Sequence, residues 1–73
     1  MGYTKVMMQK KEFAHKELYA LVQKIDPAIT GVEYTYDDNG ETVKVFYDEA
    51  VVRVDVTADS LAAIVQDVLR KVA

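Results

Sequence analysis

Hydrophobic residues recur with a helical period at both ends of the chain and alternate with polar residues in its middle. Over residues 5–25, a 3.6-residue period places one set of apolar side chains on a single stripe: Met7, Ala14, Leu18, Leu21, Val22 and Ile25. This spacing predicts a first helix. We expect the helix to end at Asp26, because Pro27 disfavours the helical conformation in the residue before it.

A second helix is predicted from about Ala58 onward, with Thr57 as its N-cap. Its apolar stripe is more regular than the first and consists of Leu61, Ile64, Val65, Val68, Leu69 and Val72. Asp59 near the start of this helix and Arg70 near its end both suit the helix dipole.

The middle of the chain predicts three strands, at residues 32–37, 42–47 and 50–56. Alternate side chains of a strand point to opposite faces of a sheet, so one face collects most of the apolar residues. That face is predicted to hold Val32, Tyr34, Tyr36, Val43, Val45, Tyr47, Val52, Val54 and Val56.

Two hairpins fix how these strands pair. Asn39-Gly40 is a strong signal for a two-residue turn. If these two residues form the loop, Tyr36 lies opposite Val43. The second reversal is predicted to place Val45 opposite Val52. The two registers agree on the same apolar face, which favours a three-stranded antiparallel meander.

We therefore predict one domain over residues 1–73, an α+β fold of two layers with the element order α-β-β-β-α. Both helices have one apolar stripe to bury, so both should cover the same apolar face of the sheet. The other sheet face is expected to be open to solvent.

The composition narrows the class of protein. The chain has 73 residues and no cysteine, so disulfides and thiolate metal sites are excluded. Its net charge of −3 disfavours a nucleic-acid-binding protein that is held by phosphate contacts. No apolar run reaches the length of a membrane span. We expect a cytoplasmic protein whose small core makes a partner or a second copy a reasonable source of further stability.

Catalytic and metal-binding patterns are missing. The chain has a single histidine, His15, and a single serine, Ser60, with no partner that their spacing would place beside them. A calcium loop with Gly40 at its sixth position would begin at Thr35 and end at Phe46, where carboxylates are required. We therefore expect no enzyme activity, no metal and no cofactor.

The open sheet face holds the first candidate interface. Phe46 and Val51 are predicted to lie opposite one another with charged residues around them, as in a small interface core with a polar rim. The candidate set is Glu33, Lys44, Phe46, Val51 and Arg53. An ordinary exposed cross-strand pair is the alternative. The strand over residues 50–56 is predicted to be an edge that could accept a strand from a peptide or a second copy.

A second surface is acidic. The predicted registers gather Asp37, Asp38, Glu41, Asp55 and Asp59 at one end of the sheet. These carboxylates either form a solvated rim that opposes aggregation, or dock a basic partner surface or a weakly held cation.

Nucleic-acid binding is the alternative function. The lysines of the first helix, among them Lys10, Lys11 and Lys16, could contact phosphates. The element order also resembles that of double-stranded RNA-binding domains, but the basic cluster that this family has at the start of its last helix is replaced here by residues 57–60, Thr-Ala-Asp-Ser. The sequence favours a non-catalytic accessory, regulatory or inhibitor protein that contacts another protein or forms a homodimer.

Overall fold

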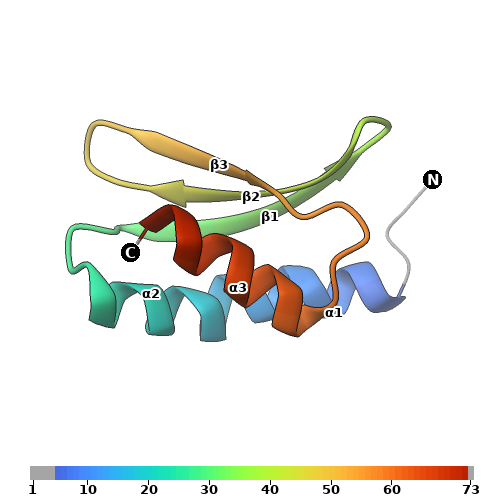
Figure 1. The fold of residues 1–73 in the computed structure, drawn as a ribbon, viewed down its shortest axis with the longest axis horizontal. Helices are drawn as coiled ribbons and strands as arrows, with labels where there is room; N and C mark the ends of the chain where they lie inside the picture. The colour runs from blue at the N-terminus through green and yellow to red at the C-terminus, as the bar shows by residue number, and fades with distance from the viewer. Residues whose placement is uncertain (1–4, 73) are drawn as a thin grey trace.

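A three-stranded antiparallel sheet forms one layer of the molecule and the helices form the other, as Figure 1 shows. The structure is a computed structural model and describes residues 5–72. The elements are α1 (Lys5–Phe13), η1 (Ala14–Leu18), α2 (Tyr19–Ile25), β1 (Gly31–Asp37), β2 (Gly40–Phe46), β3 (Val51–Asp55) and α3 (Leu61–Val72). The strand order β1-β2-β3 confirms the predicted meander and the α+β fold.

The first helical run contains one π-helical turn, η1, between α1 and α2. The amide of Tyr19 reaches the carbonyl of Ala14, five residues back, so this turn holds one residue more than an α-helical turn. The extra residue rotates α2 relative to a straight continuation of α1. Leu21 and Ile25, predicted to lie in the core, are therefore 40% and 46% exposed, while Val22 is buried.

The buried face of this helical run follows a four-residue spacing, Lys10, Ala14, Leu18 and Val22. A regular α-helix has 3.6 residues per turn, so four-residue steps drift around its axis. The π turn corrects this drift and keeps the four positions above the sheet. The core between the layers consists of Ala14, Leu18, Val22, Ile29, Val32, Tyr34, Val43, Val45, Val54, Val56, Ile64 and Val68.

One of the two predicted strand registers is correct. Val45 lies opposite Val52, as predicted. In the first hairpin, Tyr34 and not Tyr36 lies opposite Val43, so that register is shifted by two residues. A shift of two preserves the face of every side chain, so the apolar face is the one predicted. Tyr36, at the end of the sheet, is nevertheless 43% exposed.

The register is shifted because the loop is Asp38-Asn39 and not Asn39-Gly40. The carboxylate of Asp37 accepts a hydrogen bond from the amide of Asn39 at 2.8 Å. Neither loop residue has the positive φ that the predicted turn type requires, whereas Gly40 has φ +131°. Gly40 pairs with Asp37 as the first residue of β2 and contacts Thr57 so closely that a side chain would not fit.

The start of α3 also differs from the prediction. The helix begins at Leu61, and the hydroxyl of Ser60 accepts a hydrogen bond from the amide of Ala63 at 3.2 Å, which makes Ser60 the cap in place of Thr57. Thr57 instead accepts a hydrogen bond from the amide of Glu41 at 3.0 Å. The residue predicted to open the helix, Ala58, has φ +64° and so cannot belong to it.

Replacing Gly40 with alanine should lower the free energy of unfolding by roughly 2 kcal/mol or more, because φ is positive there and the new Cβ would lie 2.3 Å from the Thr57 hydroxyl oxygen. Gly31→Ala is the matched control, since its Cβ would meet Phe46 at an ordinary 3.8 Å. Urea denaturation of both variants would test this. Equal stability of the two would contradict the close contact between Gly40 and Thr57.

Candidate functional site

The sheet face away from the helices is a candidate binding surface (Figure 1). Phe46 lies directly opposite Val51, and its other neighbour is Gly31, which has no side chain, so the Phe46 ring lies beside an open position. Val51 is 43% exposed and Phe46 is half-buried. The structure therefore places this aromatic and aliphatic pair together, as expected from the sequence, on a face that no element within residues 5–72 covers.

Charged residues form the next row across the same face. Glu33 lies opposite Lys44 on β2, and Lys44 in turn lies opposite Arg53 on β3. The five residues of the candidate interface thus come together on three neighbouring strands. Two cations stand directly opposite one another in this row, an arrangement that is unfavourable in an isolated sheet.

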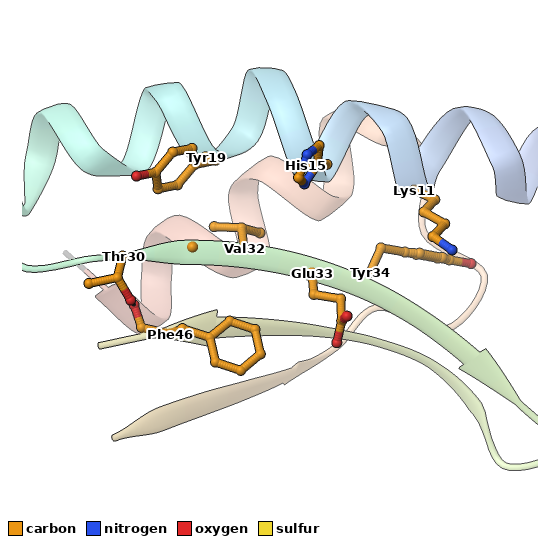
Figure 2. Close-up of a pocket in the computed structure, with 9 residues that line it drawn as sticks. Lys11, His15, Tyr19, Thr30, Val32, Glu33, Tyr34 and Phe46 are labelled. Atoms are coloured by element: carbon orange, nitrogen blue, oxygen red, sulfur yellow. The ribbon is translucent and has the colours of Figure 1, made fainter. Parts of the chain in front are cut away.

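A groove of about 340 Å³ runs between the first helical run and β1, as Figure 2 shows. Lys11, His15 and Tyr19 face β1 from the helical run, while Glu33 and Phe46 lie on the far side of the strand. The groove joins cationic, aromatic and acidic groups beside an edge strand. Sequence reasoning missed it, although the four-residue spacing of Lys11, His15 and Tyr19 places all three on one helix face.

A buried ion pair joins the helices to the end of the sheet. Lys10 Nζ lies 2.8 Å from Glu41 Oε1, and both side chains are more than nine-tenths buried. The Tyr34 hydroxyl also donates a hydrogen bond to Glu41 Oε1, and the Ala58 amide donates one to Oε2 at 2.8 Å. Burial raises the pKa of Glu41, but these hydrogen bonds and the charge of Lys10 outweigh it and hold the pKa below its ordinary value.

This ion pair removes one residue from each of the two charged surfaces that were predicted from the sequence, the acidic end of the sheet and the basic face of the first helix. Glu41 was expected at the exposed acidic end of the sheet, and Lys10 on an exposed basic helix face, but each is buried against the other. Of the remaining lysines in the alternative nucleic-acid surface, Lys16 pairs with Glu12 at 3.4 Å and Lys11 lines the groove beside β1. The three lysines therefore do not form one exposed cationic surface.

The other acidic residues mostly have local hydrogen-bonding roles. Asp37, Asp38 and Asp55 are exposed, and Asp37 accepts a bond from the Asn39 amide. Asp55 accepts hydrogen bonds from the Thr57 hydroxyl at 2.7 Å and the Thr57 amide at 3.0 Å, and these lower its pKa. Within residues 5–72, no group of three or more histidine, cysteine or acidic side chains is placed to hold a metal ion.

Asp59 differs from the other carboxylates of the acidic end. It is half-buried, and among the described residues its Oδ2 atom has no hydrogen-bond partner. The neighbouring Asp67 raises the pKa of Asp59, because a protonated Asp59 can share a hydrogen bond with it; burial and the negative charge of Asp67 act in the same direction.

Replacing Lys10 with methionine should lower the free energy of unfolding at pH 7 by roughly 3 kcal/mol, because it leaves the buried Glu41 carboxylate without its cation. A carboxylate with a lowered pKa stabilises the fold at neutral pH and loses that contribution as pH falls below about 4.5 and through its folded-state pKa. The difference between wild type and variant should therefore shrink in acid. Lys16→Met, which removes an exposed ion pair, should cost about 0.5 kcal/mol or less.

Chemical denaturation at pH 7 and pH 3 would measure both variants. A Lys10→Met variant as stable at pH 7 as Lys16→Met would contradict the buried ion pair.

Replacing Asp67 with asparagine should raise the melting temperature at pH 7, because it removes the negative charge that opposes ionisation of Asp59. A group with a raised pKa contributes stability below its ordinary value of 3.8 and loses it as pH rises through the folded-state pKa. The gain from Asp67→Asn should therefore grow between pH 4 and pH 7. Glu17→Gln, on an exposed part of the first helical run, serves as the control. A gain that is independent of pH would argue against the interaction with Asp59.

Within residues 5–72, no helix has both the length and the apolar character needed to cross a membrane. Comparisons with protein-family models, with curated proteins and with solved structures found no match to the chain.

Proposed function

We propose that this protein is a non-catalytic binding domain of the cytoplasm that recognises another protein through its uncovered sheet face. The observation that carries the proposal is the Phe46–Val51 pair at one end of that face, opposite the side on which the helices pack. An apolar pair on an uncovered sheet can become the buried centre of an interface, while its charged surroundings remain at the rim.

The rim also indicates the chemistry of the partner. Lys44 and Arg53 lie directly opposite one another, and Glu33 can offset only part of their combined charge. A carboxylate from a partner would relieve this like-charge contact and add charge-assisted hydrogen bonds. We therefore expect the partner surface to combine an apolar centre with acidic residues beside it.

Val51→Glu should abolish partner capture without unfolding the chain, because the side chain is already 43% exposed. The matched control is Val6→Glu, which makes the same chemical change on α1, where the valine is 58% exposed. Extracts of the native host would be passed over the immobilised wild type and both variants, and the captured proteins quantified by mass spectrometry.

The proposal requires at least one protein that is captured equally by wild type and by Val6→Glu. The captured amount of this protein should fall by about tenfold or more on Val51→Glu, as expected for a charge placed in an interface core. Circular dichroism would verify that all three chains are folded. Capture of the same proteins in the same amounts by all three chains would overturn the proposal.

A further inference from the structure

The free edge of β3 presents backbone groups in a defined pattern. The Val56 amide donates to the Glu41 carbonyl at 3.0 Å, and the Tyr47 amide donates to the Ala50 carbonyl at 2.8 Å. Backbone groups of successive residues point to opposite edges of a strand. Val52, Val54 and Val56 therefore bond to β2, and the amides and carbonyls of the residues between them point outward.

The outward backbone groups of β3 belong to Val51, Arg53 and Asp55. The strand order leaves this edge without a neighbouring strand among the described residues. Such an edge accepts an additional strand unless charge or geometry opposes it. The side chains of Arg53 and Asp55 decide which strand fits, since both are exposed and lie on the uncovered sheet face.

A second copy of β3 can pair antiparallel with this edge in only a few registers. Each register is named by its central residue, which lies opposite the same residue of the partner. The uncovered faces of the two sheets form one continuous face only if odd-numbered residues lie opposite odd-numbered residues. A shift by one residue would turn the side chains of the second strand to the opposite face. Centring the pair on Arg53 places two arginines opposite one another, and centring it on Asp55 does the same with two aspartates. Centring it on Val52 overlaps only residues 51–53 of the two strands and places Arg53 opposite the partner's Val51. The first two registers oppose like charges, and none of the three pairs opposite charges within β3.

Of the registers that overlap more than one residue of β3, only the one centred on Val54 is complementary. It places Arg53 opposite the partner's Asp55, and symmetry places Asp55 opposite the partner's Arg53. We propose that two copies of this chain associate through their β3 edges in this register and form a continuous six-stranded antiparallel sheet. This association goes beyond the proposed recognition of another protein and does not depend on it.

The surroundings of the β3 edge are compatible with this pairing. The hydrogen bonds from Thr57 hold the Asp55 carboxylate in its anionic form beside the edge. On the helix side, an open groove of about 450 Å³ separates β3 from α3 and is lined there by Asp67, Arg70 and Lys71. These groups carry both signs, so a second copy of α3 would not meet a surface of uniform charge.

The expected association is driven by the backbone and the charges. Val54 is only 3% exposed in one copy, so its apolar contact with the partner's Val54 adds little. Outward amides and carbonyls of Arg53 and Asp55 supply the hydrogen bonds, and the two symmetric ion pairs select the register. Since these ion pairs lie at the surface, salt should weaken the dimer.

Sedimentation equilibrium of the purified full chain tests the proposal. Arg53→Asp should raise the dimer dissociation constant by about tenfold or more, because it opposes like charges at two symmetric positions. The double variant Arg53→Asp/Asp55→Arg exchanges the charges and should restore the dissociation constant to within a few-fold of wild type. Lys24→Glu, which makes a charge reversal at an exposed position of α2, should leave it unchanged.

Asp55→Arg removes the carboxylate that accepts hydrogen bonds from Thr57, so a further variant tests the edge without changing Asp55. Arg53→Pro removes an outward-pointing amide without breaking the ladder to β2, so the chain should fold and lose the dimer. A wild-type chain that stays monomeric at its solubility limit would overturn the proposal, and so would a dimer insensitive to both Arg53 variants. A dimer lost in Arg53→Asp but not restored by the folded double variant would overturn the Arg53–Asp55 register.

The dimer is measured on the purified chain alone, whereas the proposed recognition is measured by capture of other proteins. Failure of one therefore leaves the other standing.

Discussion

The carboxylate of Glu41 connects every layer of this small fold. It extends from the central strand into the core, where it accepts hydrogen bonds from Lys10 on α1, from Tyr34 on β1 and from the amide of Ala58 ahead of α3. Removing a carboxylate from water is costly unless each oxygen finds partners. Both oxygens have partners here, so the first helical run and the approach to α3 must take the positions that supply them.

Thr57 extends this constraint to the hairpin. Its hydroxyl bonds the Glu41 amide and the Asp55 carboxylate, and it lies against Gly40, where a larger residue would not fit. The register that results places Gly31, and not Glu33, beside Phe46. The uncovered face therefore has an apolar end and a separate charged row, which is the division that an interface with a core and a rim requires.

Local patterns in the sequence were sufficient to predict the two layers of the fold, but not the register of the first hairpin or the burial of Lys10. Alternation in the strands predicted which sheet face is buried, because an error of two residues in the register leaves every side chain on its face. The hairpin loop was misplaced because Gly40 is the first residue of β2, where its φ of +131° and its contact with Thr57 across the fold both require glycine. Lys10 was expected in solvent for a similar reason, since its partner Glu41 is 31 residues away.

The π-helical turn has a consequence for chain length. The buried positions Lys10, Ala14, Leu18 and Val22 are four residues apart throughout. Without one exposed residue of the turn, such as His15 or Lys16, their spacing would become four, three and four, which suits an uninterrupted α-helix. A chain shorter by one residue at this point could keep both packed faces. In an alignment of such a chain with this one, the gap would belong inside the helix, although gaps are normally assigned to loops.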